Sequence, residues 1–256
     1  MIKKIATVAL IFAALAALLA LGTWQVQRLA WKEDLIAQSE VRPLLAPVPL
    51  DELVAETGLS HRLSIDYDDQ DIALDAAVYR RVTMDGEFFG DTIRVFTTLS
   101  DTRGVFEGPG YWLLQGFQTD QHVVFVNRGF RPFELPQGVL VARAPEGTVA
   151  LEGIVRPDET PSFLDLDPDY NEQLLYRRNV SQLMQATGVS VALPITIDLP
   201  AGDPGQLPQA GETKFEFSNR HLGYAITWYG LAATLVGVVG ISWWRRRQGG
   251  ALELEP

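Results

Sequence analysis

The 256-residue sequence contains no cysteine and only three histidines. The absence of cysteine excludes disulfide bonds, thiolate metal sites, cysteine nucleophiles and covalently attached c-type haem. Basic residues are also scarce, since 21 Lys and Arg stand against 32 Asp and Glu, for a formal net charge of −11. A nucleic-acid partner is therefore not expected, because binding to a phosphate backbone depends on clustered cations.

Motifs typical of catalysis are missing as well. The sequence contains no P-loop, no GxGxxG or HExxH pattern, no Ser/His/Asp grouping and no paired-carboxylate pattern. We therefore predict a protein without enzymatic activity. A membrane-anchored enzyme is an alternative that no sequence feature supports.

Two long apolar blocks stand near the ends of the chain. One covers residues 5–21 behind two lysines, and the other is the 23-residue uncharged run from Leu222 to Trp244, which three arginines follow. A membrane-spanning helix needs about 20 apolar residues. We therefore predict membrane helices at residues 5–24 and 221–244.

The flanking charges predict the orientation of these helices. Lys and Arg lie on the terminal side of both blocks, so the positive-inside tendency places residues 1–4 and 245–256 in the cytoplasm. Residues 25–220 would then form an extracytoplasmic domain, which carries 30 acidic against 16 basic residues, a formal charge of −14. Only four residues precede the first block, too few for a transit peptide, so the periplasmic side of a bacterial inner membrane is expected.

The first block also has to be compared with a cleaved signal peptide. It is longer than the usual apolar core of a signal, and Trp24 follows it as an interfacial anchor would, so a retained helix is favoured. Small residues four apart favour close packing of the two membrane helices. The pairs are Ala13 with Ala17, Ala16 with Ala20, Gly230 with Thr234, and Ala233 with Gly237.

Helical spacing continues beyond the first block. Trp24, Arg28, Trp31 and Leu35 recur on one face, which predicts that the helix runs on to about Ser39. Its cations either serve as interfacial anchors beside the tryptophans or meet an anionic group at the membrane surface.

The middle of the chain alternates apolar and polar residues and is rich in β-branched and aromatic side chains. These features predict strands and an antiparallel sheet or small barrel, with the third and fourth strands forming a hairpin. The expected strands are residues 79–89, 92–99, 110–119, 121–130, 147–155 and 194–199.

Helices and loops complete this domain. Residues 51–57 predict a helix closed by Gly58, and residues 176–188 predict one with Asn179 as its N-cap and Gly188 at its end. The aspartates between residues 66 and 75 lack the spacing of a calcium site, so a solvated loop is expected there.

Two side chains of the predicted hairpin allow a prediction about their environment. His122 falls at the turn, so we expect it to be exposed and without function. Arg128 either binds a carboxylate or, as is favoured in so acidic a domain, forms a structural salt bridge.

Four stretches together resemble the surfeit locus protein one family, which comprises assembly factors of haem-copper cytochrome oxidase. They are Leu21-Gly22-Thr23-Trp24-Gln25-Val26-Gln27-Arg28 with Trp31-Lys32, Tyr79-Arg80-Arg81-Val82-Thr83-Met84-Asp85-Gly86-Glu87-Phe88, Val126-Asn127-Arg128-Gly129-Phe130, and Asn219-Arg220-His221-Leu222-Gly223-Tyr224-Ala225-Ile226-Thr227-Trp228-Tyr229-Gly230. They follow the order of the family and span the chain.

The resemblance implies a function in respiratory-chain biogenesis. It implies that the protein binds haem a as cargo and delivers it to oxidase subunit I, or stabilises that subunit as a chaperone while haem enters. Bacterial members are reported to bind haem a through the histidine that begins the second helix, which is His221 here. The implied partners are subunit I, possibly haem a synthase, membrane lipid and possibly a second copy of the chain.

The residues themselves support part of this assignment. A neutral imidazole can be an axial ligand of haem iron, so His221 is the predicted metal ligand. Arg220 and Arg28 are expected to pair with propionates, while Tyr224 and Trp228 would extend an aromatic stripe along the helix. From its position alone, His221 is better explained as a polar residue solvated at the membrane edge, and the family resemblance reverses this preference.

A second reading is an extracytoplasmic sensor or binding module anchored by two membrane helices. Such receptors usually pass a signal to a cytoplasmic domain, and only residues 245–256 follow the second helix. A partner protein would therefore have to carry the signal.

Overall fold

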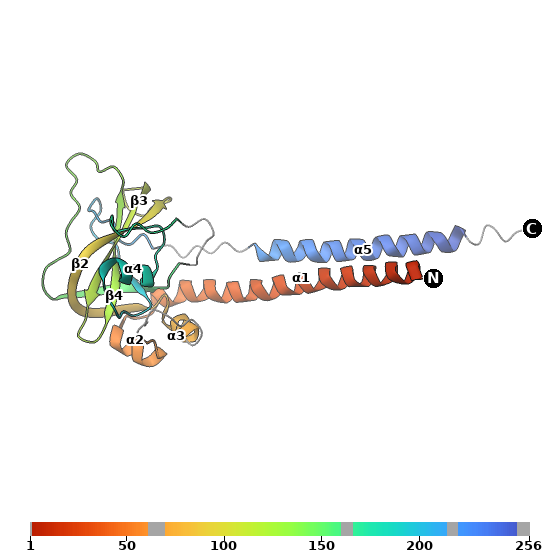
Figure 1. The fold of residues 1–256 in the computed structure, drawn as a ribbon, viewed down its shortest axis with the longest axis horizontal. Helices are drawn as coiled ribbons and strands as arrows, with labels where there is room; N and C mark the ends of the chain where they lie inside the picture. Colours follow the sequence, from red (N-terminus) through yellow and green to blue (C-terminus); the bar gives the residue numbers. More distant parts are fainter. Residues whose placement is uncertain (1, 61–69, 160–165, 214–219, 250–256) are drawn as a thin grey trace, which may run out of the picture. The chain divides into compact units, whose positions relative to one another are not determined.

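The computed structural model describes residues 2–60, 70–159, 166–213 and 220–249 (Figure 1). The chain divides into two units, one made of residues 1–38 and 215–256 and the other of residues 39–214. His61 lies outside the described residues, and so does the part of the predicted aspartate loop before residue 70.

The first unit contains two long helices, α1 (Ile2–Val41) and α5 (His221–Gly249). Both are long and apolar enough to cross a membrane, and their apolar side chains are largely exposed, as with Leu10 at 70% and Ile226 at 64%. The expected continuation of α1 to about Ser39 is confirmed. It ends before a 3-10 turn, η1 (Arg42–Leu44), where Pro43 cannot continue the helical hydrogen bonds.

The second unit is built around a curved sheet. Its elements are β1 (Val48–Pro49), α2 (Leu50–Thr57), α3 (Gln70–Ala77), β2 (Arg81–Leu99), β3 (Gly108–Gln118), β4 (Val123–Pro132), β5 (Val149–Arg156), β6 (Leu174–Leu175), α4 (Val180–Thr187) and β7 (Thr196–Asp198). The predicted hairpin of β3 and β4 is confirmed by their antiparallel register.

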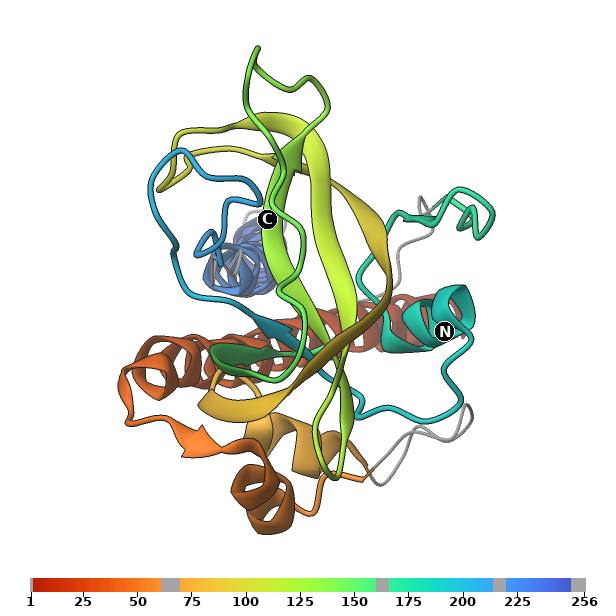
Figure 2. The same cartoon turned by 90° about the vertical axis from the view of Figure 1, so that its left-hand side faces the viewer.

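The sheet closes on itself through the long strand β2 (Figure 2). Residues 81–86 of β2 pair with β5, while residues 87–99 pair with β3. The neighbours then run β3, β4, β7, β5 and back to β2, which is the small barrel expected from the sequence. The sheet is mixed, because β7 joins β4 in parallel while most neighbours are antiparallel.

Strand β2 was predicted as two strands, and the structure corrects this. The chain continues through an irregularity between Phe89 and Ile93, where Gly90 has a φ of +67°. Glycine adopts this left-handed conformation without a Cβ clash, so the strand bends without ending.

Helices cover parts of the barrel and bury apolar side chains. In α2, Leu50 and Leu53 are buried against Phe117 in one core, and Gly58 ends the helix with a φ of +71°. In α4, Val180 and Leu183 are buried in a second core. Both faces of β4 are therefore buried, which accounts for its apolar run.

The predicted caps of α4 are confirmed. The side chain of Asn179 accepts a hydrogen bond from the backbone N–H of Gln182 at 3.0 Å, and Gly188 follows the helix with a φ of +72°. The backbone N–H of Gly188 donates to the carbonyl oxygen of Met184. Each cap therefore satisfies a backbone group that the helix leaves unpaired at its end.

Helix α3 was expected to be a solvated loop. Its aspartates dominated the sequence pattern, but Ala73 and Leu74 pack against the first core and Ala77 is fully buried. Burial of one small apolar face outweighs the unfavourable helix propensity of aspartate.

Candidate functional site

The predicted ligand His221 is the first residue of α5 and contacts α1. Its Nδ1 lies 2.7 Å from Oε1 of Gln25, a residue 196 positions earlier in the chain. The Gln25 side chain is 8% exposed although most of α1 is open. The histidine and the glutamine therefore form one polar pair between two apolar helices.

This contact is compatible with one tautomer of the imidazole ring. A carbonyl oxygen can only accept a hydrogen bond, so Nδ1 of His221 donates to Gln25. In a neutral imidazole the lone pair then lies on Nε2, the nitrogen through which such a ring coordinates a metal ion. Metal-ligating histidines are typically oriented by a hydrogen bond from the other nitrogen.

A second contact lies two turns further along α5. The hydroxyl oxygens of Tyr229 and Thr23 are 3.2 Å apart. A Cβ placed on Gly22 would lie 2.8 Å from the Tyr229 ring, so a larger residue would displace that ring. Residue numbers fall along α1 from Gln25 to Thr23 while they rise along α5 from His221 to Tyr229, so the two helices are antiparallel.

The buried and half-buried positions within residues 5–30 of α1 and along α5 follow a seven-residue repeat. They are Ile11, Leu15, Leu18, Gly22, Gln25 and Leu29 on α1, and His221, Ala225, Trp228, Ala232, Leu235 and Val239 on α5. This alternation of four and three residues is typical of two helices packed side by side along a narrow seam. Gly230 and Gly237 are exposed, so the expected small-residue pairs of α5 do not form this seam.

The other predicted site residues occupy different positions around His221. Trp228 lies on the seam, whereas Tyr224 is 54% exposed beside it, so the two do not form a single stripe. Arg220 is exposed immediately before α5. The exposed guanidinium of Arg28 lies 4.4 Å above the Trp31 ring, one turn beyond Gln25.

Gln25 was missed by the sequence analysis. An amide side chain on the apolar seam of a membrane-length helix was the available signal, because a buried polar group requires a partner. The partner itself is not readable from sequence, since it comes from the other end of the chain.

The other histidine that the structure describes, His122, makes a different contact. His122 was expected to be exposed, but it is 8% exposed and its Nε2 lies 3.4 Å from Oδ1 of Asp51 on α2. This contact joins the β3–β4 turn to α2, so the prediction was wrong and the residue has a structural role. Within the described ranges, no group of three or more His, Asp or Glu side chains is placed to hold a metal ion.

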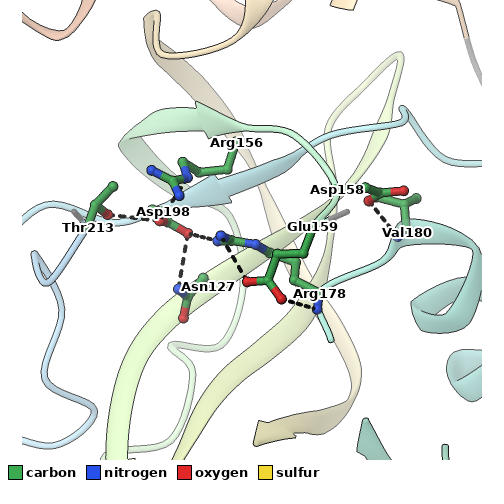
Figure 3. Close-up of polar contacts among 8 residues, drawn as sticks. All are labelled: Asn127, Arg156, Asp158, Glu159, Arg178, Val180, Asp198 and Thr213. Carbon is green, nitrogen blue, oxygen red and sulfur yellow. Dashed lines mark hydrogen bonds and ion pairs between the residues drawn. The ribbon is translucent and has the colours of Figure 1, made fainter. Parts of the chain in front are cut away.

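The second unit contains a buried ion cluster around Asp198, at the end of β7 (Figure 3). Nη1 of Arg178 lies 2.9 Å from Oδ1, and Nε of Arg156 lies 3.8 Å from Oδ2. Asn127 donates to Oδ1 at 3.0 Å and Thr213 to Oδ2 at 2.8 Å. Both carboxylate oxygens are thus engaged by the protein, which indicates a structural rather than a ligand-binding cluster.

Electrostatics in this cluster favour the ionised carboxylate. Burial alone would raise the pKa of Asp198, but Arg178, Arg156 and the two hydrogen bonds outweigh it, so the pKa is lowered from its ordinary value. Burial and the neighbouring Arg178 lower the pKa of Arg156, while Asp198 opposes this shift. Glu159 adds a second carboxylate, 3.5 Å from Nη2 of Arg178.

Arg128 differs from the favoured prediction. It is 8% exposed, yet its hydrogen bonds go to the backbone oxygen of Ala142 at 2.7 Å and to Oε1 of Gln115 at 3.3 Å. Neither partner is charged, so the expected structural salt bridge is wrong. A structural salt bridge was inferred from the abundance of acids, which does not determine where they lie.

Comparison with known proteins agrees with the motifs at both ends of the chain. The sequence profile described as "SURF1 family" matches residues 12–233. A SURF1-like protein of Monosiga brevicollis is 32% identical over 243 residues, covering 90% of this chain and 84% of that protein. Surfeit locus protein 1 of Homo sapiens is 33% identical over 232 residues, covering 83% of this chain and 69% of the human protein. The chain therefore belongs to the SURF1 family, whose members are non-enzymatic assembly factors of cytochrome oxidase.

Proposed function

We propose that this protein binds haem a at the α1–α5 pair, with His221 as an axial ligand, and assists its insertion into subunit I of cytochrome c oxidase. The observation that carries the proposal is the 2.7 Å contact between His221 and Gln25. It joins the first and last family motifs and orients an imidazole in an apolar surrounding.

The donor set fits haem iron. A neutral imidazole is a common axial ligand, and a hydrogen bond at its other nitrogen increases its basicity. Exposed apolar side chains adjoin the histidine on α5, with Leu222 at 55% and Ile226 at 64% exposed. They offer an apolar macrocycle a surface of matching polarity.

Two arginines lie near His221 and Gln25 and could pair with the propionate groups of haem. Arg220 precedes His221, and Arg28 follows Gln25 by one turn. Stacking on Trp31 leaves the edge of the Arg28 guanidinium for hydrogen bonds, because the ring occupies only its face. Each arginine supplies a forked donor for one carboxylate.

The proposal includes a membrane arrangement. Helices at residues 5–24 and 221–244 would span a bacterial inner membrane, with residues 25–220 in the periplasm and residues 1–4 and 245–256 in the cytoplasm. The lysines and arginines outside the apolar blocks support this orientation. Subunit I, haem a synthase and a second copy of the chain are the proposed protein partners.

Replacing His221 is expected to abolish stoichiometric haem binding. The protein would be purified in detergent from cells that make haem a, and its haem content measured by absorption spectroscopy and pyridine haemochrome assay. We expect His221→Ala to retain less than about a tenth of the wild-type haem, because the iron loses its protein ligand.

A matched control separates this effect from loss of any histidine. In His122→Gln an amide can still donate to Asp51, and we expect wild-type haem content. Gln25→Ala is expected to weaken binding about tenfold, the usual size of such an orienting contact. Equal haem in wild type and His221→Ala would refute the ligand assignment. Copurification of a kinase or transporter instead of oxidase subunits would favour the sensor reading.

A further inference from the structure

A pocket of about 360 Å³ in the second unit is lined by arginines from two strands and a loop. The lining residues are Thr92, Arg94, Leu113, Arg128, Arg131, Val141, Ala142 and Arg143. None of these described residues is acidic, although residues 25–220 carry a formal charge of −14. A concentration of positive charge in so acidic a domain requires a physical reason.

An irregularity in β4 brings two of these arginines to the same pocket. Arg128 and Arg131 are three residues apart, so a regular strand would direct them to opposite faces. In the β3–β4 register Trp112 is opposite Phe130 and Leu114 is opposite Asn127, so Arg128 and Gly129 together face Leu113 alone. This bulge adds one residue to β4 and places both arginines on one side, as bulges beside binding sites commonly do.

The buried guanidinium of Arg128 is the most informative group in the pocket. It is 8% exposed, pairs with no carboxylate among the described residues, and donates to two neutral oxygens. Its burial lowers the pKa of Arg128 without an opposing charge. A buried cation without a counter-ion is unfavourable, so proteins normally supply an opposite charge.

The other arginines increase the excess of positive charge. Arg94 is partly neutralised by Glu172, whose Oε2 lies 3.6 Å from its Nη2. Arg131 is half-buried and Arg143 is exposed, and neither makes an ion pair with any part of the chain that the structure describes. Three positive charges, on Arg128, Arg131 and Arg143, are therefore uncompensated at one pocket.

We propose that this pocket binds a small anion that carries two or three carboxylate or phosphate charges. The number of charges matches the uncompensated arginines, and guanidinium groups form paired hydrogen bonds with both kinds of oxyanion. The volume lies at the lower end of that of known small-molecule pockets. This site is independent of the proposed haem ligand, because every lining residue belongs to residues 39–214.

The test uses the full-length protein in nanodiscs of neutral lipid at physiological ionic strength. Citrate and pyrophosphate are the probes, and binding is measured by isothermal titration calorimetry. We expect at least one probe to bind, and the double variant R131Q/R143Q to bind it at least tenfold more weakly. Circular dichroism would verify that this variant, changed at exposed and half-buried positions, remains folded.

A control variant outside the pocket and a lipid arm complete the experiment. Arg103→Gln removes an exposed arginine outside the pocket and is expected to leave the dissociation constant unchanged. If nanodiscs containing cardiolipin, a lipid with two phosphate groups, abolish probe binding in the wild type, the anion is a lipid phosphate. If binding persists there, the ligand is a soluble anion. Absence of binding by both probes in neutral nanodiscs, or equal binding by R131Q/R143Q, would overturn the proposal.

Discussion

Asp198→Asn is expected to lower the free energy of unfolding of the second unit by about 3 to 5 kcal/mol, the usual penalty for breaking a buried ion pair. The asparagine keeps the shape of the side chain but leaves the buried guanidinium of Arg178 without its charged partner 2.9 Å away. Arg156 loses its carboxylate partner in the same cluster.

The change can be measured by urea unfolding of the full chain in detergent. Trp112 is the one tryptophan within residues 39–214, so its emission reports on this unit once the other five tryptophans are replaced by phenylalanine. Asp120→Asn is the matched control, since this aspartate is exposed, and a shift below about 0.5 kcal/mol is expected. Equal midpoints for the two variants would contradict the assigned importance of the cluster.

The same carboxylate predicts how wild-type stability depends on pH. The pKa of Asp198 is lowered in the folded protein, so the unfolded chain takes up a proton at a higher pH than the folded one. The stabilisation is therefore complete above the ordinary aspartate pKa of about 3.9 and is lost as the pH falls towards the folded value. Asp198→Asn should remove this part of the acid dependence, which urea midpoints measured from about pH 5 down to about pH 2 would show.

Gly129→Ala is expected to destabilise the second unit by about 3 kcal/mol or more, through strain and crowding together. Gly129 has a φ of +132°, where a side chain is rarely tolerated. An added Cβ would lie 2.5 Å from the carbonyl carbon of Gln209, a backbone atom that cannot rotate away. Two hydrogen bonds of 2.8 Å between Phe130 and Gln209 fix this approach.

Gly147→Ala separates crowding from backbone conformation. Gly147 also has a positive φ, +75°, but an added Cβ would meet nothing within 4 Å. Only the left-handed conformation is penalised there, by about 1 kcal/mol. Urea unfolding in detergent would compare the two, and a Gly129→Ala midpoint no lower than that of Gly147→Ala would refute the close approach as the cause.

Local features of the fold were predictable because they depend on neighbouring residues. The caps of α4 at Asn179 and Gly188 follow from the hydrogen bonds that a helix end requires. Apolar run length predicted α1 and α5, and alternation located most strands. Helix α3 was missed because its apolar face becomes favourable only against the core formed by other elements.

Contacts between distant segments could not be predicted from local sequence patterns. The sequence suggested His221, but its partner Gln25 is 196 residues away and requires the two helices to pack along one seam. Arg128 and Arg131 share a pocket only because a bulge changes the side to which one of them points. No local rule places that extra residue, because the bulge depends on the register with β3.

The sequence by itself determined two membrane-length helices, a β-rich acidic domain and the family motifs that bracket it, because run length, alternation and motif order are local properties. The tertiary structure alone decided that β7 joins β4 in parallel, that the barrel closes through β2, and that Asp198 gathers two arginines. These features depend on which side chains can be buried together, and burial is a property of the whole fold.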